Sequence, residues 1–177
     1  LTALDVARLL AEAGVPDGVV NVVPTTDAAG VVGHWLADPR VRKISFTGST
    51  RVGSILLGQA AERVVNASME LGGNAPFVVA ADADLDAAVA GAMVAKFRGG
   101  GQACTAANRF YVQEGVAAEF SRRLAERMGA LVVGPGADTG VQLGPMVNLK
   151  ARDDIAALVT TAVEDGARVL TGGAVPD

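Results

Sequence analysis

Apolar residues recur along this chain with two alternating periods, one typical of amphipathic helices and one typical of buried strands. Leu4, Ala7 and Leu10 fall on one helical face, and Pro16 lies beyond the end of that helix. The valine-rich run at residues 19–23 predicts a short strand buried on both faces. The same patterns predict helices at 27–37, 51–61, 82–97, 116–131 and 150–164, and strands at 41–46, 64–69, 77–80 and 109–113.

The alternation of strands and helices defines the fold class. Residues 19–69 follow the order β-α-β-α-β, which is typical of a parallel sheet with crossover helices. The rhythm changes after Gly72-Gly73, where a second series of strands and helices begins, with a loop rich in Gly, Pro and Asp at 134–145. We therefore predict an α/β chain in two parts, with the boundary at this glycine pair.

Composition excludes several classes of function. Half of the 177 residues are hydrophobic, which excludes a disordered chain. A single Cys excludes an internal disulfide, and with a single His it excludes the usual four-ligand zinc site, so no metal is expected. The net charge of −4 provides no basic surface for nucleic acid, and no apolar run reaches the ~18 residues of a membrane span. We expect a protein of the reducing cytoplasm, and the start without Met predicts a piece of a longer chain.

The segment FTGSTRVG, residues 46–53, follows a predicted strand and opens a predicted helix. Free backbone N–H groups at a helix start favour an anion such as a pyrophosphate, and Gly48 leaves the turn without side-chain bulk. The spacing is not that of the three-glycine dinucleotide fingerprint. On the local pattern alone, an ordinary N-cap at Ser49 is the favoured interpretation of this segment.

Cys104 follows the three glycines 99–101, in a segment that cannot be regular core helix. Glycines allow backbone to approach a ligand closely, and a thiolate is a strong nucleophile. A helix start at this point would supply backbone N–H groups that stabilise the thiolate and an oxyanion. The alternative is a small buried apolar Cys.

Two charged residues are further candidates. Glu70 ends an apolar strand beside Gly-Gly, where α/β proteins place functional groups, although a strand-end carboxylate can also be merely exposed. Arg98 either pairs structurally with Asp82 or Asp84 or binds a substrate carboxylate as a bidentate fork.

Taken together, FTGSTRVG (46–53), MELGGNAP (69–76) and FRGGGQACTAANRFYV (97–112) resemble the aldehyde dehydrogenase superfamily in order and spacing over essentially the whole chain. In most detail the motifs resemble succinate-semialdehyde dehydrogenases. The resemblance implies a Rossmann-like cofactor lobe, with residues 1–70 as part of the NAD(P)-binding domain. It implies that residues 71–177 form the first part of an α/β catalytic domain carrying the thiol.

The resemblance also implies roles for the candidate residues. Cys104 resembles the nucleophile that forms a thioester from the aldehyde, and Glu70 resembles the general base that activates water. Arg98 resembles the arginine that holds the distal carboxylate of a semialdehyde such as succinate semialdehyde. NAD or NADP is the implied cofactor, and a homo-oligomer is implied for the full-length protein. The residues that match the cofactor site are Gly48, Ser49, Gly53, Leu71 and Gly72.

Departures from the family pattern leave alternatives open. Family chains are much longer and carry, outside this window, an oxyanion-hole Asn and the ribose contacts, so we expect the isolated chain to be nearly inactive. Gly99 stands where an Asn is usual, and Ala106 replaces the second Cys of some relatives, which excludes a disulfide switch there. The substrate is alternatively glutarate semialdehyde or an aromatic aldehyde, with a structural Arg98. A further alternative is an inactive truncated chain with only nucleotide-binding or scaffold character.

Overall fold

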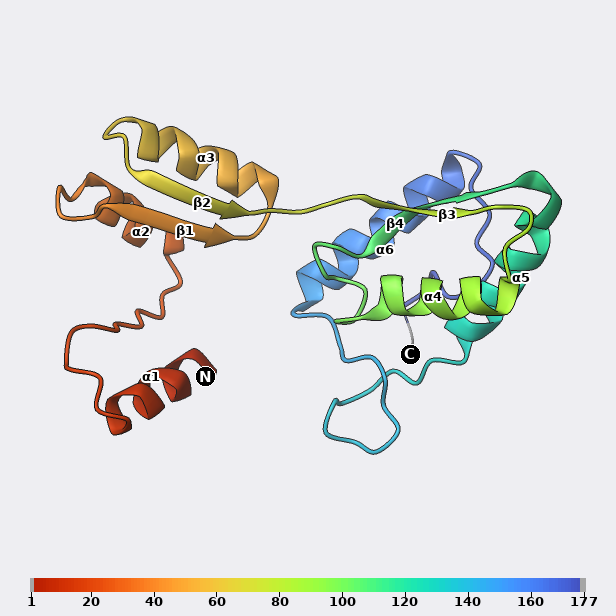
Figure 1. The fold of residues 1–177 in the computed structure, drawn as a ribbon, viewed down its shortest axis with the longest axis horizontal. Coiled ribbons are helices and arrows are strands. Elements are labelled where there is room, and N and C mark those ends of the chain that lie inside the picture. Colours follow the sequence, from red (N-terminus) through yellow and green to blue (C-terminus); the bar gives the residue numbers. More distant parts are fainter. Residues whose placement is uncertain (1, 176–177) are drawn as a thin grey trace. The chain divides into compact units, whose positions relative to one another are not determined.

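The computed structural model describes residues 2–175. The contacts between residues divide the chain into two compact units, Leu1–Leu71 and Gly72–Asp177 (Figure 1). The predicted α/β class with parallel strands is confirmed in both units. The elements of the first unit are α1 (Thr2–Glu12), α2 (Ala28–Ala37), β1 (Lys43–Thr47), α3 (Thr50–Ala61) and β2 (Asn66–Glu70). Those of the second are β3 (Ala75–Val79), α4 (Leu85–Phe97), β4 (Ala107–Val112), α5 (Glu114–Gly129) and α6 (Leu149–Glu164).

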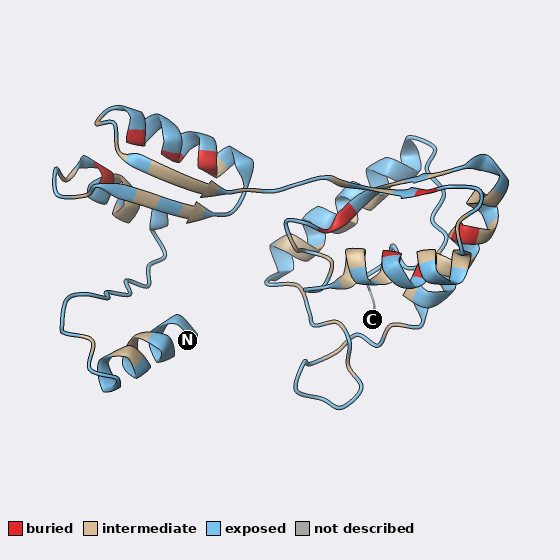
Figure 2. Ribbon diagram, in the orientation of Figure 1, coloured by how far each residue is buried: buried red, intermediate tan, exposed pale blue. Residues whose placement is uncertain are grey.

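In the first unit, β1 and β2 pair in parallel and α3 connects them. The register places Thr47 opposite Glu70, so the two strands end at the same edge. The buried residues of α3 are Gly53, Leu56 and Ala60, and their spacing of three and four puts them on one side of the helix (Figure 2). This side packs on both strands.

The strand predicted at residues 19–23 is wrong. These residues form no strand, and Val19 is 66% exposed. A parallel strand is held by hydrogen bonds to a neighbouring strand, and within residues 2–175 no strand pairs with this run. The run of valines alone therefore does not define the element.

The strand predicted from residue 64 begins two residues later because the chain turns there. Val64 has a φ of 54°, a left-handed conformation that is incompatible with a strand. The amide of Val65 donates to the carbonyl of Ala60 at 2.9 Å, so this residue still closes the end of α3. The ladder with β1 starts only at Asn66.

In the second unit, the sheet of β3 and β4 buries one face. Phe77 lies opposite Phe110 in the parallel register, and alternate residues point to opposite faces. Both rings pack against Phe120 of α5, with centroid distances of 6.5 Å and 6.3 Å. The opposite face is open, since Val78 is 73% exposed. The buried core consists of Val79, Val89, Ala92 and Phe120.

The segment after α5 is largely irregular, as predicted for residues 134–145. One isolated bridge joins Val133 to Leu143. The helix α6 that follows is capped by Asn148, whose side chain accepts from the amide of Ala151, and it buries no residue. Over the part of the chain that the structure describes, no helix has the length and apolar character needed to cross a membrane.

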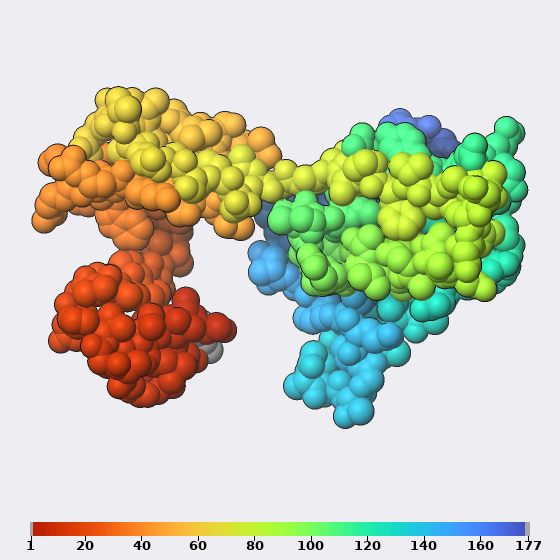
Figure 3. Space-filling model, viewed as in Figure 1, coloured from red at the N-terminus to blue at the C-terminus, as the bar shows by residue number. Residues whose placement is uncertain are grey.

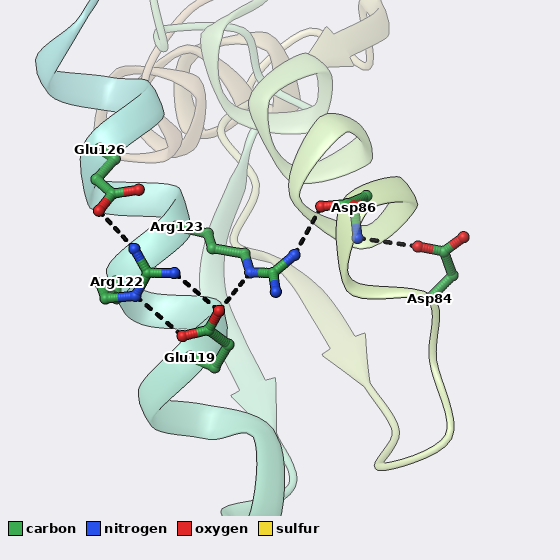
Figure 4. A network of polar contacts seen from close by, with 6 residues as sticks. All are labelled: Asp84, Asp86, Glu119, Arg122, Arg123 and Glu126. Atoms are coloured by element: carbon green, nitrogen blue, oxygen red, sulfur yellow. Dashed lines mark hydrogen bonds and ion pairs between the residues drawn. The ribbon is translucent and has the colours of Figure 1, made fainter.

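An exposed ion-pair network links α5 to α4 (Figure 4). The carboxylate of Glu119 accepts hydrogen bonds from Arg122 at 2.8 Å and from Arg123 at 2.7 Å. Arg123 also donates to Asp86 in the first turn of α4, at 2.7 Å. The hydrogen bonds from Arg122 and Arg123 lower the pKa of Glu119 from its usual 4.5 to about 2.

Candidate active site

The turn between β1 and α3 brings several predicted site residues together. Ser49 is the N-cap of α3, and its Oγ accepts from the amide of Val52 at 3.3 Å. The amide of Gly48 donates to the carbonyl of Glu70 at 3.0 Å, which ties the turn to the end of β2. The amides of Thr50 and Arg51 have no acceptor among residues 2–175. The capping interpretation of Ser49 is therefore confirmed, and two N–H groups stay available for an anion.

Gly48 in this turn and Gly53 in the first turn of α3 make room for side chains. A Cβ at position 48 would collide with the ring of Phe46. A Cβ at position 53 would lie 2.6 Å from Cδ2 of Leu71, so Gly53 allows Leu71 to lie against the first turn of α3. The structure thus places Leu71 beside the predicted anion-binding turn.

Glu70 is the last residue of β2 and is exposed. Its carboxylate has no hydrogen-bond or ion-pair partner within the described residues. A carboxylate without a partner on the protein can contact a water molecule or a ligand.

Cys104 lies in a loop shaped by three glycines. Gly99, Gly100 and Gly101 have φ values of 66°, 69° and 78°, a region that glycine enters without steric cost. These residues turn the chain sharply after α4.

The expectation of a helix start at Cys104 is wrong. Cys104 occupies a β-turn closed by the amide of Ala106 and the carbonyl of Ala103, at 2.9 Å. The chain then enters β4 directly at the buried Ala107, because that strand pairs with β3. The thiol is exposed, so the alternative of a buried apolar Cys is also wrong. The green segment that contains it reaches the surface of the second unit (Figure 3).

Gly73 approaches the backbone of Cys104 closely. A Cβ at position 73 would lie 2.5 Å from the carbonyl oxygen of Cys104, whereas one at Gly72 would meet nothing within 4 Å. Gly73 therefore lets the segment before β3 pass against the thiol-bearing turn.

Arg98 is the C-cap residue of α4 and is exposed. Its guanidinium donates to Oγ1 of Thr105 at 3.3 Å. The structural pairing with Asp82 or Asp84 is wrong, because Asp84 instead caps the start of α4, at the other end of the helix.

A cavity of about 230 Å³ opens beside the thiol-bearing turn. Arg98 lines this cavity together with Ala103 and Thr105, the residues before and after Cys104. The guanidinium of Arg98 gives this cavity one cationic group, which can bind an anion. Its lining residues are Val94, Ala95, Arg98, Ala103 and Thr105.

Sequence reasoning missed three residues of this region: Lys96, Asn108 and Gly73. Lys96 Nζ lies 2.7 Å from Oδ1 of Asn108, and Asn108 Nδ2 donates to the carbonyl of Gly73 at 3.3 Å. The local sequence carries no signal of this pairing, because it joins residues that are 12 and 35 positions apart. Among the described residues, no group of three His, Cys, Asp or Glu side chains gathers as metal ligands would.

The comparisons with known proteins agree with this architecture. The family model described as "Aldehyde dehydrogenase family" matches residues 1–177, and the chain therefore belongs to that family. The resemblance stated from the motifs is thus confirmed.

Two curated relatives and one solved structure show which members of the family the chain resembles. The chain is 58% identical over 177 residues to the succinate-semialdehyde dehydrogenase of Paenarthrobacter nicotinovorans, covering 100% of this chain and 39% of that protein. It is 46% identical over 173 residues to the glutarate-semialdehyde dehydrogenase of Pseudomonas aeruginosa, covering 97% and 35%. The crystal structure of an E. coli NADP dependent enzyme superposes with a TM-score of 0.93 at 47% identity, covering 99% of this chain and 36% of that one. The chain thus spans well under half the length of the relatives it matches.

Proposed function

We propose that the whole protein containing this chain oxidises an aldehyde to a carboxylate with NAD or NADP, and that succinate semialdehyde is the substrate. The observation that carries the proposal is the exposed thiol of Cys104 in its glycine-shaped turn, beside the cavity that holds Arg98. The 58% identity to a succinate-semialdehyde dehydrogenase over the whole chain supports the same substrate.

Cys104 acts as the nucleophile in this proposal. The thiolate sulfur attacks the aldehyde carbon to form a thiohemiacetal, and loss of hydride from that carbon leaves a thioester on Sγ. NAD or NADP, when bound, supplies the acceptor for the hydride. The exposure of the thiol allows an aldehyde to reach it without a rearrangement of the core.

Glu70 is the proposed general base for the second half of the reaction. Its carboxylate takes a proton from water, whose oxygen attacks the thioester carbon and releases the carboxylic acid and the Cys104 thiolate. The absence of an ion-pair partner for Glu70 among the described residues supports this role. Glu70 belongs to the first unit and Cys104 to the second, so the role of each residue is argued from the surroundings of that residue alone.

The proposed cofactor-binding part, residues 1–70, lies in the first unit. The proposed thiol domain, residues 71–177, corresponds to the second unit except for Leu71, which belongs to the first. The donor set at the start of α3 fits a pyrophosphate, since the amides of Thr50 and Arg51 are unpaired within the described residues. Gly48 and Ser49 shape this turn, and Gly53 leaves space for Leu71. Leu71 and Gly72 are assigned to the nicotinamide pocket by family resemblance.

The substrate carboxylate is assigned to Arg98. A guanidinium binds a carboxylate through two parallel hydrogen bonds, which gives a dicarboxylic semialdehyde a fixed orientation. Glutarate semialdehyde, one methylene longer, is the second candidate, because the relative from Pseudomonas aeruginosa acts on it by name.

The test is an aldehyde panel assayed by NAD(P)H formation in the whole protein, with NAD and with NADP. We expect turnover of succinate semialdehyde that exceeds that of an aromatic aldehyde, and loss of turnover and of thioester formation in Cys104→Ala. Turnover that survives Cys104→Ala would exclude the mechanism. The 177-residue chain by itself is expected to give little or no NAD(P)H, and the whole protein is expected to elute as a homo-oligomer in size-exclusion chromatography.

A further inference from the structure

A pair of side chains outside the proposed reacting groups, Lys96 and Asn108, forms hydrogen bonds around the loop of Cys104. Lys96, half-buried in the last turn of α4, donates from Nζ to Oδ1 of Asn108 at 2.7 Å. The same Nζ lies 3.4 Å from the carbonyl oxygen of Gly101. Asn108 in turn donates from Nδ2 to the carbonyl of Gly73 at 3.3 Å. One continuous set of hydrogen bonds thus connects the glycine-rich loop, α4, β4 and the segment before β3.

The glycine run of this loop contributes no side-chain contacts of its own. Gly99, Gly100 and Gly101 have no side chains to pack, and glycine loses more conformational freedom on folding than any other residue. The ammonium of Lys96 has three donors, of which the bonds to Asn108 and Gly101 use two. These bonds hold the end of the glycine run three residues before the thiol.

We propose that Lys96, acting through Asn108 and the carbonyl of Gly101, is a positioning residue that orders the loop carrying Cys104. This inference rests on the proposed function of Cys104 as the nucleophile. Lys96 does not touch the reacting atoms and does not line the cavity that contains Arg98. Its role is to keep the thiol in the geometry required for attack, where a displacement of about 1 Å costs on the order of 10²-fold in rate.

Lys96 and Arg98 lie two residues apart but have different partners. Arg98 reaches across the loop to Thr105 with a single bond of 3.3 Å, which leaves most of its donors available for a substrate carboxylate. Lys96 is committed to Asn108 and to the backbone of Gly101. The two cations therefore have different roles: Lys96 holds the loop, and Arg98 lines the cavity.

The test uses Lys96→Met and Lys96→Arg in the whole protein, with Lys150→Met as the matched control. Lys150 lies on α6, where Asp154, which is exposed, is its only side-chain partner within residues 2–175. The first readout is hydrogen–deuterium exchange of peptides covering residues 98–108, which requires no turnover. We expect faster exchange in Lys96→Met only in these peptides, partial recovery in Lys96→Arg, and no change in Lys150→Met.

The second readout is steady-state kinetics. Lys96→Met is expected to lower kcat by about 10²-fold while the KM for the cofactor stays as in the wild type. Wild-type exchange at residues 98–108 in Lys96→Met overturns the inference. If the wild type oxidises no aldehyde, the proposed function fails, and the exchange data still decide whether Lys96 orders the loop.

Asn108→Ala and the double variant complete the test. If both side chains act through their shared hydrogen bond, the double variant loses little more than the larger single loss, whereas additive losses overturn the proposal. Should Lys96→Met fail to fold, Asn108→Ala must show the same local rise in exchange, and wild-type exchange in that variant overturns the proposal.

Discussion

The backbone of Gly73 lies directly against that of Cys104, the proposed nucleophile, because a Cβ at position 73 would lie 2.5 Å from the carbonyl oxygen of Cys104. The atom that a methyl group at position 73 would meet is a backbone oxygen and not the end of a flexible side chain. The loop of Cys104 therefore has to move if this methyl group is added. The position of the thiol thus depends on the absence of a side chain at Gly73.

Gly73→Ala is therefore expected to displace the turn of Cys104 and to lower kcat by about 10²-fold in the whole protein. The matched control is Gly115→Ala in the first turn of α5, where a Cβ meets nothing within 4 Å. Steady-state kinetics of both variants check the prediction. An unchanged kcat in Gly73→Ala would show that the loop accommodates the methyl group without moving the thiol.

The contact between Gly53 and Leu71 gives a prediction about the cofactor. A methyl group at position 53 would lie 2.6 Å from Leu71 Cδ2, the far end of a flexible side chain, so the fold tolerates it while Leu71 moves away. If Leu71 lines the nicotinamide pocket, Gly53→Ala raises the KM for the cofactor by about tenfold. Gly58→Ala in the same helix has open space around it and should change nothing. Equal KM values in both variants contradict the assignment of Leu71.

Ser49 combines two roles that one substitution can separate. Its Oγ caps α3 at Val52, and Ser49→Ala should lower the free energy of unfolding by about 1 kcal/mol. Ser49→Asp keeps a side-chain acceptor for the cap but brings a negative charge to the proposed pyrophosphate site. We expect Ser49→Asp to unfold like the wild type and to bind NAD(P) far more weakly, as measured by fluorescence titration. If Ser49→Asp binds NAD(P) with wild-type affinity, the pyrophosphate does not bind at this turn.

Local chemistry made part of this structure predictable. Ser49 and Asp84 cap helices through bonds to amides two or three residues away, and such signals are visible in a short stretch of sequence. Phe77 and Phe110 could be assigned to strands from the apolar pattern around them. The family motifs likewise identified the candidate residues around Cys104.

Features that depend on distant partners were not predictable in the same way. Whether residues 19–23 form a strand is decided by the presence of a neighbouring strand, and the valines contain no information about that. The turn of Cys104 follows from the pairing of β3 with β4, which sends the chain straight into a strand. The bond of Lys96 to Asn108 depends on the same strand pairing, so local patterns did not reveal it.

The network around Glu119 makes stability depend on pH. The folded-state pKa of about 2 lies below the usual 4.5, so the unfolded chain binds more protons between these values. The contribution of Glu119 is therefore fully present above about 4.5 and is lost as the pH falls toward 2. Glu119→Gln is expected to lower the thermal midpoint at pH 7, with a difference from wild type that shrinks over this window and in high salt.

The control for this experiment is Glu164→Gln in α6. Glu164 is exposed and has no ion-pair partner among the described residues, so its replacement should leave the midpoint at pH 7 unchanged. A midpoint difference for Glu119→Gln that stays constant down to pH 2 would show that the hydrogen bonds to Arg122 and Arg123 do not contribute through charge.

The choice of substrate is tested most directly at Arg98. Removing a charge-assisted hydrogen bond to a carboxylate costs about 10–100-fold in affinity, and an aldehyde without a carboxylate loses nothing. Arg98→Ala should therefore raise the KM for succinate semialdehyde by that factor and leave the KM for an uncharged aldehyde nearly unchanged. Arg98→Lys keeps the charge but not the fork, so it should recover only part of the loss.

Thr105→Val separates substrate binding from the orientation of Arg98. It removes the hydroxyl that accepts from the guanidinium at 3.3 Å and leaves the charge in place. If the bond holds Arg98 toward the cavity, Thr105→Val gives a smaller rise in the same KM and again spares the uncharged aldehyde. Equal effects of Arg98→Ala on both aldehydes would mean that Arg98 supports the loop of Cys104 and does not read the substrate, and the choice between succinate and glutarate semialdehyde would then lie with other residues.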